Sequence, residues 1–160
     1  MSMSVVANMR QFERGLDQSY NRFEKKMSKR MRMLVHEGMK RLIRRTPVHT
    51  GQAVRSYVAS AGAPYGGGPA SEGKPVEPTN KLPLGAESLR GGAERQALAT
   101  VASVDFSDPF QVFWITNSAP HIGGLERGEL PEEPYTPRSP AGMFGVTLQE
   151  LITLLDAGMT

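Results

Sequence analysis

The first 46 residues constrain the fold of this chain more than any other segment. No proline interrupts residues 5–45, and large apolar side chains recur there at spacings of three and four, which is the pattern of one helical face. We therefore predict one long helix over residues 5–45, about 60 Å in length. Gly15 and Gly38 weaken it locally by about 1 kcal/mol each. A chain of 160 residues has too little other surface to cover such a stripe, so we expect part of the helix to pack on a neighbouring subunit. The stripe comprises Phe12, Leu16, Tyr20, Phe23, Met27, Met31, Leu34, Val35, Met39, Leu42 and Ile43.

Charge is distributed unevenly along the chain. Residues 1–46 hold 12 Lys or Arg and 4 Asp or Glu, a net charge of +8, whereas residues 47–160 hold 7 and 12, a net charge of −5. In an assembly, a basic helix of one subunit can meet an acidic surface of the next, or it can line a channel. The candidate channel or interface residues are the cations that share one face of the predicted helix: Arg22, Lys25, Lys26, Lys29, Arg30 and Arg32.

The same basic face could follow nucleic-acid phosphates. The chain has no helix-turn-helix or zinc-finger pattern, so base-specific recognition is not expected. Proximity to DNA, if it occurs, should be non-specific.

The remaining residues predict an α+β fold with a small antiparallel sheet of three to four strands and a C-terminal helix. The helix should end at Thr46-Pro47, and the Thr50 hydroxyl should cap a helical turn before a strand at 54–60. Residues 62–92, with eight Gly and five Pro, predict a flexible loop. The strands expected at 96–104 and 110–117 form a hairpin. A short helix within 120–128 and a final helix at 141–157 complete a single domain, 1–160, in which 93–160 holds the hairpin and the last helix.

No residues are assigned to catalysis, to a cofactor or to a metal. The chain contains no cysteine, and His36, His49 and His121 are far apart in the sequence. The sequence therefore predicts a protein that is not an enzyme and needs no cofactor. It also lacks a basic, apolar leader and a long apolar run, so neither export nor a membrane contact is expected.

Three segments, taken in order, resemble the tail-completion and neck protein family of long-tailed bacteriophages, the lambda minor tail protein Z-like group. They are Thr46–Gly51 with the following Arg-Ser-Tyr, Asn117–Gly128, and Ser139–Met143. His49 stands where the family usually has Asp, and His121 stands where it has Tyr. The residues that carry the resemblance are Thr46, Pro47, Thr50, Gly51, Arg55, Tyr57, Asn117, Pro120, Glu126, Gly128, Pro140, Ala141 and Gly142.

The resemblance implies a structural virion protein that forms a ring, expected to be a hexamer, in the phage neck or tail. It would be made in the host cytoplasm, and its partners would be copies of itself, the connector or stopper, and the tail terminator or tail tube. One alternative is a head-tail adaptor or tail terminator in an adjacent ring. An alternative of another class is a non-specific DNA-binding accessory protein.

Overall fold

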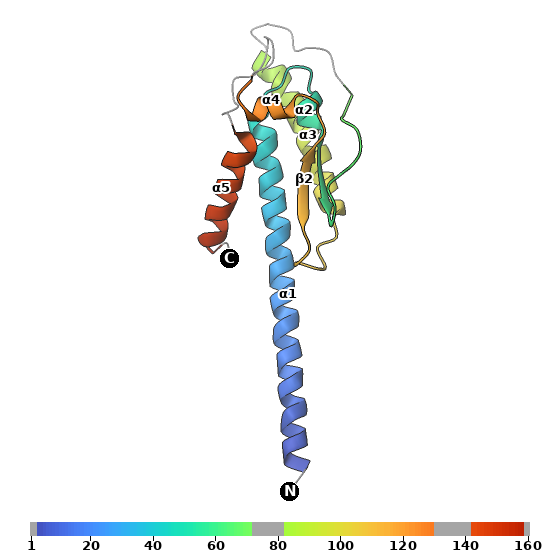
Figure 1. Cartoon of the computed structure of the whole chain (residues 1–160), viewed down its shortest axis with the longest axis vertical. Coiled ribbons are helices and arrows are strands. Elements are labelled where there is room, and N and C mark those ends of the chain that lie inside the picture. The colour runs from blue at the N-terminus through green and yellow to red at the C-terminus, as the bar shows by residue number, and fades with distance from the viewer. Residues whose placement is uncertain (1–2, 72–81, 130–141, 159–160) are drawn as a thin grey trace.

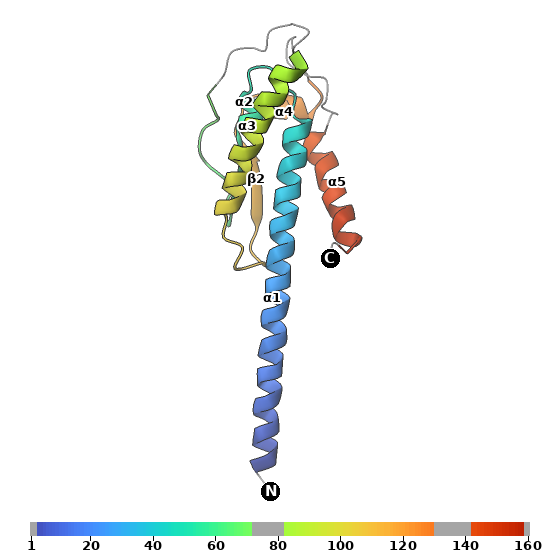
Figure 2. The same ribbon diagram turned by 180° about the vertical axis from the view of Figure 1, so that it is seen from behind.

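A computed structural model describes residues 3–71, 82–129 and 142–158 of the chain, and Figures 1 and 2 show it from two sides. The fold is mixed: mostly helical, with one two-stranded antiparallel sheet. The predicted long N-terminal helix, the short helix within 120–128 and the C-terminal helix are all present. The elements are α1 (Met3–Arg45), α2 (Gln52–Arg55), β1 (Tyr57–Ala61), α3 (Leu82–Ser103), β2 (Phe113–Asn117), α4 (Ile122–Glu126) and α5 (Met143–Asp156).

Only the C-terminal half of α1 enters the core. There, Leu34, Met39 and Ile43 are buried against the rest of the chain. Every side chain from residue 8 to residue 23 is exposed, and the N-terminal half of α1 projects far beyond the other elements (Figure 1). We call residues 8–30 the stalk, and the remaining described elements with the C-terminal half of α1 the head.

The sheet is smaller than the predicted three to four strands, and its pairing differs. β1 pairs with β2 in antiparallel register, from Tyr57 opposite Asn117 to Ala61 opposite Phe113. The predicted partner of β2, residues 96–104, is not a strand. β1 itself starts at Tyr57 rather than at residue 54, because residues 52–55 form the helical turn α2.

Residues 96–104 were predicted as a strand and lie instead in the C-terminal half of α3 and just after it. The apparent alternation of small and larger side chains was misleading. Ala93, Ala97, Val101 and Val104 are all buried, and their spacings of four, four and three place them on one helical face. Ala, Leu, Gln, Glu and Arg dominate this segment, and they are strong helix formers. The predicted hairpin of 96–104 and 110–117 is therefore wrong.

The loop predicted over residues 62–92 extends too far, because a helix begins within its last part. Residues 62–71 are irregular, but residues 82–92 belong to α3 despite Pro83 and three glycines, Gly85, Gly91 and Gly92. Proline is tolerated in the first turn of a helix because its missing N–H would have no partner there. Residues 72–81 lie outside the described part of the chain.

Arg90 of α3 links two helices. Its Nη1 donates hydrogen bonds to the carbonyl oxygens of Ile43 at 2.7 Å and Arg44 at 2.9 Å, at the end of α1 where backbone acceptors have no helical partner. A cation at this end also interacts favourably with the helix dipole. Among the described helices, none is both long and apolar enough to cross a membrane.

Candidate assembly interface and the junction that supports it

The first of the three family-like segments meets the sheet through two hydroxyls. Thr46 follows α1, and its Oγ1 donates to the carbonyl of Leu42 at 2.7 Å. The same oxygen lies 2.9 Å from the hydroxyl of Tyr57 in β1. Both side chains are buried. Burial raises the pKa of Tyr57 to about 12, although its hydrogen bonds with Thr46 and Asn117 oppose that rise.

Asn117 ties the end of β2 to two neighbouring segments. Its Nδ2 donates to the carbonyl of Ala53 in α2 at 2.8 Å, and its Oδ1 accepts from the backbone N–H of Ala119 at 3.0 Å. The side chain thus fixes both α2 and the turn that leads into α4. A residue with one donor group and one acceptor group is required for this pair of bonds.

Glu126 supplies the N-terminal cap of α5 from outside that helix. Its carboxylate accepts from the backbone N–H of Phe144 at 2.8 Å and of Gly145 at 3.2 Å, and its carbonyl accepts from Gly142 N at 2.7 Å. Gly142 has a φ of 76° and offers no side-chain cap. A carboxylate at a helix N-terminus satisfies unpaired N–H groups and interacts favourably with the helix dipole.

The middle of α5 is held to α1 by charge. Glu150 forms ion pairs with Arg41 and Arg45, and Arg45 Nη1 donates to Thr147 Oγ1 at 2.8 Å. The hydrogen bonds from Arg45 and Arg41 lower the pKa of Glu150. These side chains remain partly exposed, so the pairs contribute modestly to stability. They fix which face of α5 meets α1.

The other residues that carry the resemblance have local roles. Gly51 has a φ of 79°, which favours glycine, and its carbonyl accepts from Arg55 Nε at 3.1 Å. The Thr50 hydroxyl accepts only a long bond, 3.5 Å, from Gln52 N, so the predicted cap of α2 is weak. Pro47 is buried, Pro120 is exposed before α4, and Gly128 follows α4 with a φ of 87°. Pro140 and Ala141 lie outside the described residues.

The three segments therefore meet at one place in the head. Thr46, Tyr57, Asn117, Glu126 and Gly142 join the end of α1, the sheet, α4 and the start of α5 through the bonds above. The sequence alone had not indicated these partners. The roles of Arg90 and Glu150 were missed altogether, because each binds a residue more than 45 positions away.

The stalk carries a row of large apolar side chains in solvent. Met9, Phe12, Leu16, Tyr20 and Phe23 are 50–69% exposed, and we call them the stalk stripe. Their spacings of three and four repeat every eleven residues, a period that keeps a stripe almost straight along a helix. Phe23 stacks on Phe110, with ring centroids 6.3 Å apart. An exposed apolar row of this kind is a candidate interaction surface.

A second apolar row lies on α5. Leu148, Ile152 and Leu155 are 42–57% exposed and follow one another at spacings of four and three, so they share a helical face. This face is separate from the one held by Glu150 and Thr147 against α1. We call it the outer face of α5.

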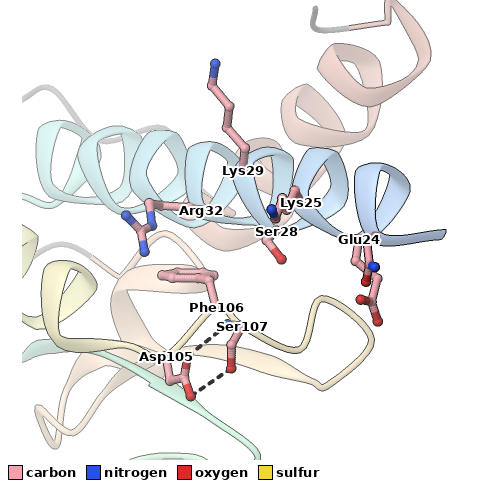
Figure 3. A pocket seen from close by; sticks show the side chains of 9 residues that line it. Glu24, Lys25, Ser28, Lys29, Arg32, Asp105, Phe106 and Ser107 are labelled. Atoms are coloured by element: carbon pink, nitrogen blue, oxygen red, sulfur yellow. Dashed lines mark hydrogen bonds between the residues drawn. The ribbon is translucent and has the colours of Figure 1, made fainter. Parts of the chain in front are cut away.

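The predicted basic cluster lies on the stalk, except for Arg32 just beyond it, and its side chains do not share one environment. Arg22, Lys25, Lys26 and Lys29 are exposed, and Arg30 is partly buried. Arg32 turns toward the loop after α3, with its guanidinium carbon 5.2 Å from the centroid of the Phe106 ring, whereas Lys29 points away from that loop (Figure 3). Arg32 is thus engaged within the subunit by a cation–π contact.

A hollow of about 580 Å³ separates this part of α1 from residues 105–107 (Figure 3). Residues of both signs of charge line it: Lys25, Lys29 and Arg32 together with Glu24 and Asp105. The Asp105 carboxylate accepts from the N–H and the hydroxyl of Ser107, which lowers its pKa. An open hollow with mixed charge is suited to polar contacts rather than to a single anion.

His49 and His121, the two departures from the family pattern, line one hollow of about 290 Å³ beside Gly51 and Leu125. Within the described residues, no three His, Asp or Glu side chains gather into a group that could hold a metal ion. Comparison with known protein families, with curated proteins and with solved structures finds no match to this chain.

Proposed function

We propose that this protein is a structural subunit of a tailed bacteriophage, a ring-forming tail-completion or neck component that joins the head connector to the tail. The observation that carries the proposal is the stalk, in which five large apolar side chains stand in solvent along one straight face. Keeping such a surface exposed is unfavourable, so the stalk is suited to an assembled state. The resemblance of three segments to phage tail-completion proteins supports the phage neck as the place of that assembly.

The head supports the same proposal. The family-like segments, widely separated in the sequence, meet in one buried and hydrogen-bonded junction around Tyr57. The residues that carry the resemblance hold this part of the fold together through hydrogen bonds, which supports a structural role. The partners proposed are other copies of the chain, the connector or stopper above, and the tail terminator or tail tube below.

The test is deletion of the coding sequence from the phage genome that carries it. We expect heads and tails that fail to join or to mature, with infectivity restored by the wild-type chain. A Phe12→Gln/Leu16→Gln variant should not restore it, whereas Gln11→Ala/Gln18→Ala, on the opposite side of the same helix, should. Infectious particles formed without the chain, or a virion map in which it contacts no other copy of itself, would overturn the proposal.

The first alternative, an adaptor or tail terminator, differs only in the ring that the chain occupies. Its position in an electron-microscopy map of the virion separates these assignments. Contact with the head connector alone favours an adaptor, and contact with the end of the tail tube favours a terminator.

The second alternative is non-specific DNA binding, which the exposed cations of the stalk favour. Phosphate contacts predict binding that falls steeply with salt and shows no preference between duplexes. The measurement is a salt titration against two unrelated duplexes, with virion assembly scored in parallel. Assembly is scored for a variant that lacks the cations of the basic cluster. If the wild-type chain has negligible affinity for DNA and this variant nevertheless fails to assemble, the result favours the ring. Tight binding that survives about 200 mM salt favours the DNA-binding function. The variant changes five residues to Gln: Lys25, Lys26, Lys29, Arg30 and Arg32.

A further inference from the structure

The stalk stripe has the same spacing in both directions along α1. Its side chains follow one another at intervals of three, four, four and three residues, so the pattern is symmetric about Leu16. A second stalk that runs in the opposite direction can therefore oppose every member of the stripe with another member. The opposed pairs are Met9 with Phe23, Phe12 with Tyr20, and Leu16 with its own copy.

The position of α5 favours this antiparallel direction. A Cβ added at Gly38 would lie 3.0 Å from Leu151 Cδ1 of α5, and Arg41 forms an ion pair with the same helix. Tyr20 precedes Gly38, and Phe23 precedes Arg41, by eighteen residues, which is five full turns. The stripe and α5 therefore lie on the same side of α1. A parallel partner would meet α5 as it continued toward its own head, whereas an antiparallel partner carries its head to the opposite end of the stalk.

The free length of the stalk also suits an antiparallel partner. Residues at equal distances on either side of Leu16 oppose each other, so Met3 of one copy comes level with Lys29 of the other. α5 extends to about this level, because Leu154, near its C-terminal end, lines the same hollow as Arg32. Below that level the stalk continues well past α5 (Figures 1 and 2). The partner's stalk thus ends near the point where α5 begins to cover α1.

We infer that two copies of the free chain pair through their stalk stripes, antiparallel and centred on Leu16. Both copies use the same patch, so the contact is isologous, with a two-fold axis beside Leu16. It removes from water the apolar surface that a single chain exposes. This inference goes beyond the proposed function, because it describes the chain before it enters any larger assembly.

The apolar areas of the two stalks match, because the two patches are identical. With roughly 200 Å² for each fully exposed side chain of this size, the stripe presents on the order of 500 Å² of apolar surface. Phe110 is 61% exposed and stacks on Phe23, so it enlarges the patch where Met9 of the other copy arrives. The pair can therefore bury about 1,000 Å² in total, in the range of weak and transient interfaces. Such a dimer separates readily when another partner competes for the stalk.

The cations of the stalk do not oppose the pairing. Arg14, Lys25 and Lys29 lie on the side of α1 opposite the stripe, as their positions along the helix show. They stay in solvent, away from the other copy, where salt screens them. Glu24 lies beside the stripe, and in the antiparallel pair it comes level with Arg10 of the other copy on the same flank. That pair of opposite charges favours the arrangement.

Two carboxylates lie near their counterparts at the centre of the pair. Glu13 and Asp17 flank the stripe, and Glu13 of one copy comes close to Asp17 of the other. Each follows an arginine by three residues, Arg10 and Arg14 respectively, a spacing at which opposite charges attract on a helix. Both carboxylates are exposed, so water and salt weaken their repulsion. Burial of the apolar stripe therefore decides the contact.

Cysteine crosslinking tests the pairing and its direction, because the chain has no cysteine of its own. The full chain is used at concentrations where the wild type sediments as a dimer. Leu16→Cys should form a disulfide with its own copy on mild oxidation. Mixed Met9→Cys and Phe23→Cys chains should also crosslink. Neither of these two should crosslink alone, because in the antiparallel pair each residue lies about 20 Å from its own copy.

The matched control is Gln18→Cys, an exposed residue on the opposite side of the stalk, which should give no crosslink. Sedimentation gives a second readout. Leu16→Gln should weaken the dimer on the order of a hundredfold, because two leucines at its centre lose their apolar contact. Ile152→Gln, on the outer face of α5, should leave the dimer unchanged.

Three results would overturn the inference. Met9→Cys that crosslinks with itself would mean parallel stalks. Loss of the dimer in Ile152→Gln would place the contact on α5. A wild-type chain that stays monomeric at all concentrations tested would mean that the stripes do not pair. The proposed function is judged separately by the deletion phage, so the failure of one is distinguishable from the failure of the other.

Discussion

Tyr57 is the residue at which the separate parts of the head meet. Its ring is buried and lies 6.1 Å from that of Phe144 in α5, and its hydroxyl faces Thr46 at the end of α1. An uncharged hydroxyl suits this site, because ionised oxygen would lose its hydration there. This one side chain therefore makes the junction sensitive to alkaline pH.

Tyr57→Phe should lower the free energy of unfolding at neutral pH by about 1 kcal/mol, because the hydrogen bond with Thr46 is lost. The pKa of Tyr57 is about 12 in the folded chain and 10.0 without the protein environment. Its contribution to stability is therefore complete below pH 10 and is lost as the pH rises through 12. Denaturant unfolding of the wild type should weaken more steeply than that of the variant over this window.

The matched control for neutral pH is Tyr65→Phe, which removes a hydroxyl from an exposed ring and should change stability by less than about 0.5 kcal/mol. Equal alkaline slopes for the wild type and Tyr57→Phe would contradict the role given to the buried hydroxyl.

Glu126 makes the start of α5 depend on a residue outside that helix. Glu126→Ala should cost about 1–2 kcal/mol, because the N–H groups of Phe144 and Gly145 lose their acceptor. Hydrogen exchange at those two amides should accelerate. Glu129→Ala is the control, since Glu129 is exposed and, among the described residues, its carboxylate pairs with the nearby Arg127. Unchanged protection at Phe144 would show that α5 starts without the carboxylate.

At the scale of elements, the two glycines of α1 separate helix propensity from helix packing. Both lower helix stability in the same way, so the sequence alone predicts the same local effect at each position. A Cβ at Gly15 would meet nothing within 4 Å, whereas one at Gly38 would lie 3.0 Å from Leu151 Cδ1 and 3.2 Å from Ile115 Cδ1. Gly38 therefore permits the close approach of α5 and β2 to α1.

Gly38→Leu should destabilise the chain by about 1–3 kcal/mol through overpacking, and Gly15→Leu should stabilise it by up to about 1 kcal/mol through helix propensity. Thermal or urea unfolding of the two variants measures the difference. If both substitutions stabilise the chain, α5 and β2 do not rest on α1 at Gly38.

At the scale of the whole molecule, the head contains the core that stabilises the subunit, and we propose that the stalk supplies assembly contacts. Among the described residues, the buried core draws on α1 from Leu34 onward, with Met31 packed against its edge. The stalk contributes exposed cations and the stripe. The head supplies the junction and the outer face of α5. The chain is thus organised as a folded body with an arm.

Deletion of residues 1–22 should leave the stability of the head nearly unchanged, within about 1 kcal/mol, because the described side chains it removes are all exposed. The same deletion should abolish self-association, because it removes four of the five residues of the stripe. Urea unfolding and analytical sedimentation measure the two effects independently. A large loss of stability would mean that the stalk belongs to the core of a single subunit.

The sequence by itself determined the features that are encoded locally. The long helix follows from an apolar period of 3.6 without proline, its end follows from Thr46-Pro47, and α5 follows from its own amphipathic pattern. These signals need only neighbouring residues, because helix hydrogen bonds join residues four apart. The sequence also identified the motif residues of the junction, but it did not identify their hydrogen-bond partners.

The tertiary structure alone decided the rest. Small side chains in 93–104 fit both a strand and a helix, and burial of Ala97 and Val101 on one face selected the helix. β2 pairs with a strand more than 50 residues away, and Glu126 caps a helix that begins 17 residues later. Such choices depend on which surfaces meet when the chain closes on itself, because pairing and burial are contacts between segments and not properties of either segment.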